Sequence, residues 1–295
     1  MNQKISIILP AKNESANIAA VIKNIKKHCN NLNNYEILII NDGSTDNTSE
    51  IAETNGARVI THPYSMGNGA AIKTGARNAT GNIFVFMDAD GQHNPADIPK
   101  LLNKMNQGYD MVVGARIPSA QASLPRRFAN TFYNRFASLM TGHRIEDLTS
   151  GFRAVKAQQF RKFLYLLPNG FSYPTTSTMA FFRSGFPVAY IPINCAKREG
   201  KSHIRVAKDG MRFFIIILRI GSLFSPMRLF LPISGSVFLT GISYYCYTFI
   251  TSGRFTNMSA LLILSSLIIF MIGILSEQVS SLHYKDFERH PWDKK

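Results

Sequence analysis

The sequence predicts an α/β fold in which a mostly parallel sheet with flanking helices is followed by two membrane-spanning helices. In the N-terminal third, short apolar runs alternate with amphipathic stretches, which is typical of βαβ units and a parallel sheet. One of these runs, residues 83–87, ends in the carboxylate pair Asp88 and Asp90. Near the C-terminus, residues 229–253 and 259–276 carry no charge and are long enough to cross a bilayer.

Each predicted element follows from the local pattern of apolar residues. Runs of β-branched and aromatic residues predict buried strands over residues 5–9, 36–40, 58–61, 83–87 and 111–114. Apolar residues at helical spacing predict helices over 17–28, 48–55, 67–78 and 125–141. The first strand is followed by PAKNE at residues 10–14. A dinucleotide-binding domain requires a G-x-G-x-x-G turn at that point, so this class is excluded.

The length and the charge of the chain limit the classes of protein to which it can belong. The 295 residues suffice for one good-sized domain and a smaller part, and they carry a net charge of +15. Nearly all of this excess lies in residues 111–228, which hold 18 basic and 4 acidic side chains. This segment is expected to face phosphate groups, acidic lipid headgroups or nucleic acid. Three cysteines far apart in the sequence predict reduced thiols in a cytosolic domain, and no cleavable signal peptide precedes the first strand.

Two stretches combine basic and apolar side chains at helical spacing. In the predicted helix 125–141, an aromatic stripe either packs against the domain core or lies at a membrane surface. A second predicted helix, residues 202–225, is strongly apolar and carries a basic stripe along one face. A bilayer interface accommodates both features, so we expect an interfacial amphipathic helix there. The aromatic stripe consists of Phe128, Phe132, Phe136 and Leu139, and the basic stripe of Arg205, Lys208, Arg212 and Arg219.

The two uncharged stretches predict a transmembrane hairpin, and two buried core helices are the alternative. Basic residues crowd the outer ends of the hairpin, whereas the connection between its helices holds only Arg254. The positive-inside rule therefore places both outer ends, and with them the N-terminal domain, in the cytoplasm. This predicts a multi-pass protein of the cytoplasmic (inner) membrane. The predicted parts are a cytoplasmic α/β domain at 1–200, an interfacial helix at 201–228, the hairpin at 229–281 and a cytoplasmic tail at 282–295.

Acidic residues follow two of the predicted strands. Asp88 and Asp90, one residue apart at the end of a buried strand, repel each other unless a cation lies beside them. Hard oxygen ligands of this kind suit Mg²⁺ or Mn²⁺, although an acidic turn is the simpler interpretation. Asp42 and Asp46 follow the second strand and either contact a ligand or cap the next helix. We favour a ligand for Asp42 and the cap for Asp46.

Five motifs in register carry a family resemblance. They are PAKNE at 10–14, NDGSTD at 41–46, DADGQH at 88–93, LTSGFR at 148–153 and REGKSH at 198–203. With the first three the chain resembles the family 2 glycosyltransferases of the GT-A fold. The last two motifs and the two C-terminal spans narrow the resemblance to the polyprenyl-phosphate glycosyltransferases, the group that includes dolichol-phosphate mannose synthase.

The resemblance implies a role for particular residues. Asp90 would ligate Mg²⁺ or Mn²⁺, with Asp88 and Gln92 assisting and Ala89 lying against the nucleotide. Arg116 would lie beside the phosphates, and Arg153 would either join that cationic pocket or pair with Asp147. The base and ribose of the nucleotide would be bound by Pro10, Lys12, Glu14 and Asp42. The donor and acceptor phosphates would be bound in a pocket formed by Arg126 or Arg127, Arg198 and Lys201. The residues implied in catalysis itself are Asp90, Arg116, Arg198 and Lys201.

The implied reaction moves a sugar from a UDP- or GDP-linked donor to undecaprenyl or dolichyl phosphate, with inversion, at the cytoplasmic membrane face. A lipid phosphate monoester is already anionic near neutral pH, so no general base is required. None of the seven histidines is expected to sit in a cluster of catalytic groups, and Asp147 is the single plausible base, with an orienting role as the alternative. Membrane lipids are expected partners and nucleic acid is not, while the oligomeric state, a homo-oligomer included, stays open.

Other functions fit parts of the pattern. A family 2 enzyme with a polysaccharide or glycolipid acceptor shares the α/β domain, but a processive synthase would carry a Q-x-x-R-W motif and more spans, and Trp292 is the one tryptophan. A catalytically inactive membrane scaffold would not need Asp88, Asp90 and Gln92. Residues 170–180 contain no carboxylate, and because this segment is expected to line the sugar pocket, the identity of the sugar stays open.

Overall fold

The computed structural model describes residues 4–30, 32, 34–117, 124–170, 172–195, 214–219, 221–223 and 225–288, without the side chains of 124–130 and 283–288. The chain forms two compact units. The first comprises Met1–Arg135 with Arg144–Ile216, and the second comprises Phe136–His143 with Ile217–Lys295. Most of the predicted interfacial helix, with Arg205, Lys208 and Arg212, lies outside the described residues, although 214–219 and 221–223 are helical.

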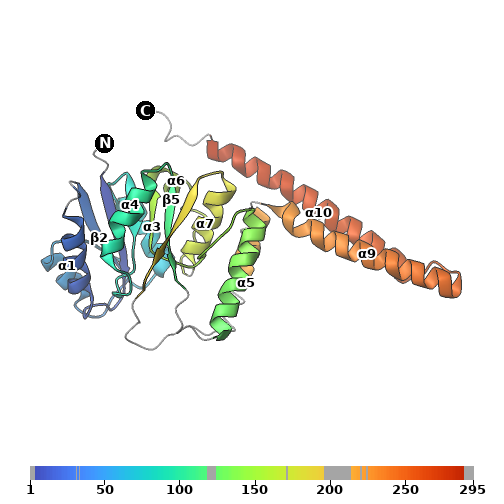
Figure 1. Ribbon diagram of the computed structural model, residues 1–295, viewed down its shortest axis with the longest axis horizontal. Helices are drawn as coiled ribbons and strands as arrows, with labels where there is room; N and C mark the ends of the chain where they lie inside the picture. The colour runs from blue at the N-terminus through green and yellow to red at the C-terminus, as the bar shows by residue number, and fades with distance from the viewer. Residues whose placement is uncertain are drawn as a thin grey trace. The chain divides into compact units, whose positions relative to one another are not determined.

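In the first unit, the described residues form a seven-stranded sheet of order β3-β2-β1-β4-β6-β5-β7 (Figure 1). Strand β6 is antiparallel to both of its neighbours, β4 and β5, and every other adjacent pair is parallel. The prediction of a mostly parallel sheet is therefore confirmed. The strands are β1 (Ile5–Ala11), β2 (Tyr35–Asn41), β3 (Arg58–Thr61), β4 (Ile83–Phe86), β5 (Met111–Arg116), β6 (Arg153–Lys156) and β7 (Val188–Ile193).

Helices cover both faces of this sheet because successive strand residues point to opposite sides (Figure 1). On one face, Ile7 and Leu9 join a buried cluster with the apolar sides of α1 and α4. On the other face, Ile8 and Ile40 lie against α3. The helices of this unit are α1 (Ile18–Cys29), α2 (Thr48–Thr54), α3 (Asn68–Asn78), the short η1 (Pro95–Asp97), α4 (Ile98–Met105), α6 (Ala157–Lys162) and α7 (Tyr173–Arg183).

Helix α5 (Leu124–Thr141) contributes residues to both units and matches the predicted helix 125–141. Its aromatic stripe does not pack as a core face would. Phe132 is 57% exposed and Leu139 is 63% exposed, whereas Ala137 and Met140 are buried. Packing of these two residues against the domain core, one of the two interpretations of the stripe, is therefore wrong.

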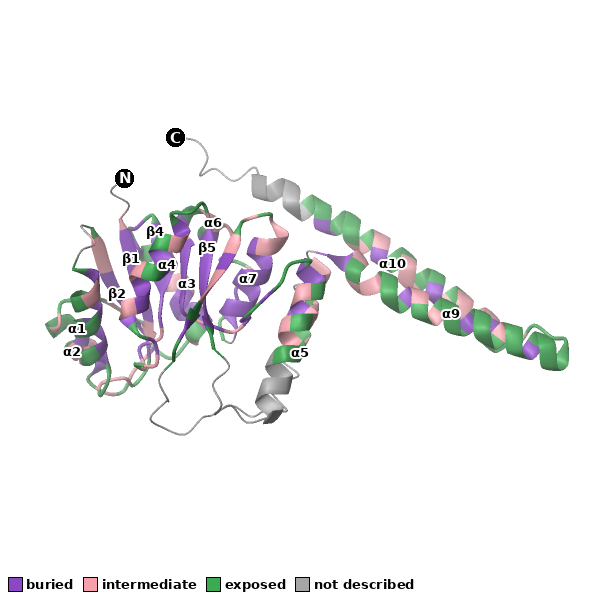
Figure 2. Cartoon of the chain, in the orientation of Figure 1, coloured by how far each residue is buried: buried purple, intermediate pink, exposed green. Residues whose placement is uncertain are grey.

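The second unit is dominated by a pair of long apolar helices, α9 (Pro226–Ser252) and α10 (Asn257–Glu288). Both are long and apolar enough to cross a membrane, and only 11% and 17% of their most apolar segments are buried within the chain. Figure 2 shows exposed and half-buried residues along both helices. Where α9 begins, the Glu277 carboxylate accepts a hydrogen bond from the Met227 N–H (3.3 Å), and the Ser280 hydroxyl donates to the Leu223 carbonyl (2.5 Å). The alternative of two buried core helices is therefore wrong.

The contact between α3 and β1 generates a stability prediction. A Cβ at Gly75 would overlap Cγ2 of Ile8, which is fully buried and β-branched and so cannot swing away. Alanine normally stabilises a helix interior by about 0.5–1 kcal/mol relative to glycine, but overpacking a core costs about 1–3 kcal/mol. We expect Gly75→Ala to lower the free energy of unfolding by about 1–2 kcal/mol, measured by urea unfolding in detergent. Gly170→Ala, where a Cβ meets nothing within 4 Å, is the matched control. Equal stability of the two variants would contradict this account.

Candidate active site

A polar cavity of about 410 Å³ opens where β1, β2 and β4 end. These three strands are parallel neighbours, so the loops that follow them meet at the same edge of the sheet. The structure thus brings together seven of the predicted site residues from the ends of these three strands and the loops that follow them. The cavity is lined by Pro10, Lys12, Glu14, Asp42, Asp88, Ala89 and Asp90, together with Ala11, Ser65, Gly67 and Asn68.

Other predicted residues do not line this cavity. Gln92 and Arg116 lie outside its lining, although the Gln92 N–H donates to Oδ1 of Asp90 (3.1 Å). Arg198 and Lys201 lie outside the described residues, and the side chains of Arg126 and Arg127 are not described either. Their roles stay predictions.

Asp88 and Asp90 lie at the edge of the cavity with partly exposed side chains. Among the described residues, no three His, Cys, Asp or Glu side chains cluster into a metal site closed by protein alone. Two accessible carboxylates nevertheless fit Mg²⁺ or Mn²⁺, because such ions bind through one or two carboxylates and complete their coordination with water and substrate phosphates. The donor set therefore fits a cation shared with a bound diphosphate.

His93 lies beside this carboxylate pair. Its Nε2 is 3.5 Å from Oδ2 of Asp88, and its Nδ1 is 3.6 Å from Sγ of Cys195. Burial alone would lower the pKa of His93, but its hydrogen bond to the Asp88 carboxylate outweighs burial and raises the pKa to about 9. The prediction that no histidine belongs to a cluster is wrong for this residue. Its position within DADGQH was the available signal, whereas Cys195 is 102 residues away and left none.

Asp42 organises the loop between β3 and α3. Its buried carboxylate accepts hydrogen bonds from the Met66 N–H (2.7 Å), the Gly67 N–H (2.9 Å) and the Ser65 hydroxyl (2.8 Å), and it lies 2.8 Å from Nδ1 of His62. Burial alone would raise the pKa of Asp42, but these bonds, that of His62 foremost, hold the pKa below its usual value. The carboxylate therefore shapes the wall of the cavity from within the protein.

The loop after β1 is held by the loop after β2. Asn13 adopts a left-handed conformation (φ 55°), and its side-chain oxygen accepts a hydrogen bond from the Thr45 N–H (2.8 Å). Asp46 accepts from the Ser15 N–H and, at the start of α2, from the Thr48 N–H (both 3.1 Å). Asp46 therefore bonds to the first residue of α2, as the predicted cap would, although Asn47 is the residue that directly precedes the helix. Lys12 donates to the Ser65 hydroxyl (3.0 Å), which links this loop to the one that Asp42 organises.

The N-terminus of α3 is occupied by the chain itself. Gly67 has φ 100°, and a Cβ there would lie 2.6 Å from the Asn169 carbonyl oxygen. In the first turn of the helix, the Gly69 N–H and the Ala70 N–H donate to the Gly170 and Asn169 carbonyls (3.2 and 2.8 Å). The close approach that these glycines permit is therefore made by residues 168–170.

Arg116 and Asp147 form a two-pronged ion pair. Nε of Arg116 is 2.8 Å from Oδ2 of Asp147, and Nη2 is 2.9 Å from Oδ1. The same carboxylate accepts from the Arg116, Thr149 and Ser150 N–H groups. Burial alone would raise the pKa of Asp147, but the hydrogen bond and charge of Arg116 lower it. A carboxylate held in this way orients Arg116, and its lowered pKa favours the orienting role of Asp147 over that of a general base.

Arg153 lies fully buried behind the site. Its Nη1 donates to the Pro174 carbonyl (3.1 Å) and to the Ser177 and Thr178 hydroxyls (both 2.9 Å). It therefore anchors α7, and both the exposed phosphate contact and the pairing with Asp147 that the sequence suggested are wrong. Helix α7 is itself buried from Tyr173 to Phe181, so this part of the segment expected to line a sugar pocket is core.

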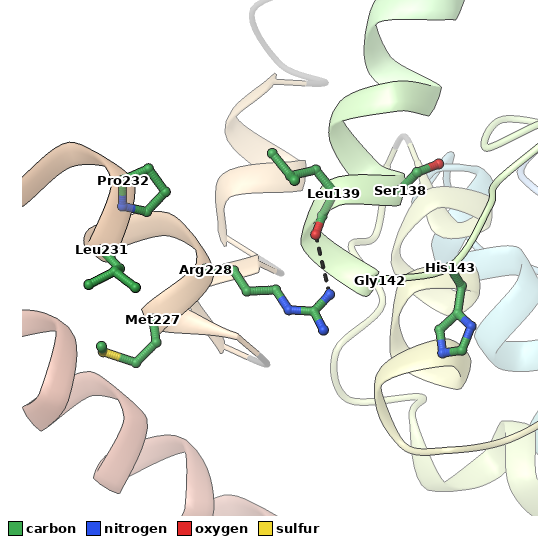
Figure 3. A pocket seen from close by; sticks show the side chains of 8 residues that line it. All are labelled: Ser138, Leu139, Gly142, His143, Met227, Arg228, Leu231 and Pro232. Atoms are coloured by element: carbon green, nitrogen blue, oxygen red, sulfur yellow. Dashed lines mark hydrogen bonds between the residues drawn. The ribbon is translucent and has the colours of Figure 1, made fainter. Parts of the chain in front are cut away.

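A second cavity, of about 540 Å³, lies within the hairpin unit (Figure 3). Its walls come from the last turn of α5 and the first turns of α9, and they include Leu139, Met227 and Leu231. Arg228 points toward the end of α5 and donates to the Leu139 and Met140 carbonyls (3.3 and 3.4 Å). This contact satisfies carbonyls that the helix end leaves without intrahelical partners.

The four bonds to Asp42 generate a prediction for stability and its pH dependence. Asp42→Asn puts an amide donor against backbone donors, so we expect it to lower the free energy of unfolding at pH 7 by about 1–3 kcal/mol. A carboxylate with a lowered folded-state pKa stabilises the protein above its unfolded pKa of about 3.9 and loses this effect as the pH falls. The difference in stability between wild type and Asp42→Asn should therefore shrink in urea unfolding as the pH falls from about 5 through the lowered folded-state pKa of Asp42. A constant difference across this range would contradict the assignment.

Comparison with known proteins places this geometry in a family. The profile of "Glycosyl transferase family 2" matches residues 6–165, and that of "GtrB C-terminal hairpin" matches residues 225–282. The chain is 27% identical to Glycosyltransferase AglJ of Haloferax volcanii over 97% of this chain and 96% of that protein. It is 33% identical to undecaprenyl-phosphate 4-deoxy-4-formamido-L-arabinose transferase of Klebsiella pneumoniae over 52% of this chain and 49% of that protein.

The fold is shared with a solved structure of glucosyl-3-phosphoglycerate synthase from Mycobacterium tuberculosis in complex with Mn²⁺, uridine diphosphate and phosphoglyceric acid. The TM-score is 0.62 at 22% identity, over 74% of this chain and 78% of that one. The predicted fold class and family are thereby confirmed. With the Asp88–Asp90 pair at the edge of its cavity and an apolar hairpin after the α/β domain, the chain belongs to glycosyl transferase family 2 and is a membrane-associated glycosyltransferase of the GT-A fold.

Proposed function

We propose that this enzyme transfers a sugar from a nucleotide-sugar to a polyprenyl phosphate at the cytoplasmic face of the membrane. The observation that carries the proposal is the carboxylate pair Asp88 and Asp90 at a polar cavity, in a chain that ends in an apolar helical hairpin. The name of the Klebsiella relative supports a polyprenyl phosphate acceptor. The uridine diphosphate and Mn²⁺ in the mycobacterial structure support a nucleotide donor with a divalent cation.

The donor is assigned to the cavity at the ends of β1, β2 and β4. Asp90 holds the cation with Asp88 and Gln92, while Lys12, Glu14 and Pro10 contact the nucleotide. A bound Mg²⁺ or Mn²⁺ neutralises the charge that develops on the leaving diphosphate. Since Asp42 already uses both carboxylate oxygens within the protein, it acts on the nucleotide by shaping the loop that the nucleotide meets.

Arg116 supplies a fixed positive charge beside the phosphates of the nucleotide-sugar. Its side chain is 42% exposed, yet Asp147 and Thr149 hold its guanidinium in place. A pre-oriented guanidinium stabilises developing phosphate charge without reorganising during the reaction. Asp147 contributes by orientation and takes up no proton.

The acceptor phosphate is the nucleophile. Its second pKa lies near 6, so it attacks the anomeric carbon as an anion and inverts the configuration there. We assign Arg198 and Lys201, with Arg126 or Arg127, to this phosphate, because the segment that contains them carries most of the positive charge of the chain. Catalysis then rests on positioning and on charge neutralisation of the leaving group.

Transfer to lipid gives the decisive test. Membranes containing the enzyme are incubated with radiolabelled UDP- and GDP-sugars, Mg²⁺ or Mn²⁺, and undecaprenyl or dolichyl phosphate. We expect label in the organic phase, and a loss of at least about a hundredfold in Asp90→Asn or in EDTA because the diphosphate lacks its counter-charge. Glu53→Gln, on the exposed side of α2, is the control for a lost carboxylate and should transfer like wild type.

The outcomes separate the alternatives. Label in a polymer or in a pre-existing glycolipid would identify a different acceptor for the same donor site. Full activity of Asp90→Asn would remove the carboxylate pair from the site. Absence of transfer from every donor would support an inactive scaffold.

Membrane topology is tested independently. We propose that the catalytic domain and the C-terminus are cytoplasmic and that α9 and α10 both cross the membrane. A reporter fused after Lys295 should then report the cytoplasm, and one inserted at Thr256, between the helices, should report the opposite side. Both reporters on one side would refute the transmembrane hairpin.

A further inference from the structure

The Asp88 carboxylate is confined on two sides. One of its oxygens, Oδ2, lies 3.5 Å from Nε2 of His93. A Cβ added at Gly151 would lie 3.1 Å from the same oxygen, so the backbone at this position limits the carboxylate on another side. The side chain is 36% exposed. Asp88 therefore reaches the cavity while part of its carboxylate faces fixed protein groups.

The His93 ring is itself held at three places. It is buried, and it stacks on Phe152 with ring centres 5.1 Å apart and planes 19° from parallel. Its second nitrogen, Nδ1, lies 3.6 Å from Sγ of Cys195, just beyond the end of β7. The three contacts come from chain segments that follow β4, precede β6 and follow β7. A ring held on one face and at both nitrogens presents Nε2 to Asp88 in one orientation.

We propose that His93 is a positioning residue of the cation site: it orients the Asp88 carboxylate toward the cavity, and Cys195 in turn orients His93. The proposal rests on the proposed function, in which Asp88 helps to hold the divalent cation. Carboxylates that ligate metals are commonly oriented by hydrogen-bond partners, and loss of such a partner costs about 10–100-fold in metal affinity. His93 is such a partner of the Asp88 carboxylate, and Cys195 is in turn a partner of His93.

The first test separates orientation from packing. His93→Phe keeps a flat ring to stack on Phe152 and removes both ring nitrogens. In the purified full-length protein in detergent, we expect the Kd for Mn²⁺, measured from the electron paramagnetic resonance signal of free Mn²⁺, to rise about 10–100-fold. The unfolding temperature should stay near that of wild type. In transfer assays, the Mn²⁺ concentration for half-maximal activity should rise, with kcat at saturating Mn²⁺ close to wild type. Wild-type affinity for Mn²⁺ in a folded His93→Phe protein would overturn the proposal.

Two further variants keep the test decisive. His93→Gln retains a side-chain donor and should bind Mn²⁺ more tightly than His93→Phe. Cys195→Ala alters an exposed residue, leaves His93 in place and should weaken Mn²⁺ binding less than His93→Phe does. If His93→Phe fails to fold, these two variants decide, and wild-type affinity in both overturns the proposal.

The thiol provides a readout that does not depend on catalysis. Of the three cysteines, Cys29 is buried whereas Cys195 and Cys246 are exposed, so Cys246→Ser leaves Cys195 as the accessible thiol. We expect Mn²⁺ to slow the reaction of Cys195 with an aromatic disulfide reagent, because a bound cation fixes Asp88 and with it the His93–Cys195 contact. Asp88→Asn should abolish this effect. An identical rate with and without Mn²⁺ would contradict the coupling.

Asp90→Asn distinguishes failure of this inference from failure of the proposed function. If Asp90→Asn binds Mn²⁺ as wild type does, the cation site itself is misassigned. If Asp90→Asn loses affinity while His93→Phe and Cys195→Ala keep it, the cation site stands and only the role of His93 is refuted.

Discussion

Parallel pairing of β1 with β2 on one side and β4 on the other is the constraint on which the site depends. The registers pair Leu9 with Ile39 and Ile8 with Phe86, so the three strands end at one edge of the sheet. Because the strands run in the same direction, their following loops converge there. The buried apolar runs hold this register, since a slip by one residue would turn each core side chain to the opposite face. Carboxylates from all three loops thereby meet in one cavity.

Two buried carboxylates near this edge, Asp42 and Asp147, are paired, and their hydrogen bonds give the loops their shape. The Asp42 carboxylate accepts hydrogen bonds from backbone amides of the loop before α3, and the Asp147 carboxylate forms an ion pair with the guanidinium of Arg116. A buried carboxylate without such partners would cost several kcal/mol, so each one specifies the conformation of the backbone around it. Rigid loops of this kind let a site stabilise charge without reorganising during a reaction.

The hairpin follows a different physical rule. Helices α9 and α10 expose most of their apolar side chains, which in water would oppose folding and in lipid would not. At the end where α9 begins, Glu277 and Ser280 of α10 bond to the backbone at Met227 and Leu223. The packed α/β unit and the apolar hairpin thus differ in where their apolar side chains lie, buried in the first and largely exposed in the second.

The elements with strong local signals were predictable from the sequence, because strand and helix periodicity and acidic residues after a buried strand depend on neighbours along the chain. Strands β1 to β5, the Asp88–Asp90 pair and the two apolar helices belong to this group. Tertiary structure decided the rest, because it pairs residues that no local pattern connects. Strand β6 enters the sheet antiparallel, Arg153 becomes buried against α7, Arg116 meets Asp147, and Cys195 meets His93 across 102 residues. Whether a charged side chain contacts ligand or core depends on which distant segment covers it, and only the folded chain determines that.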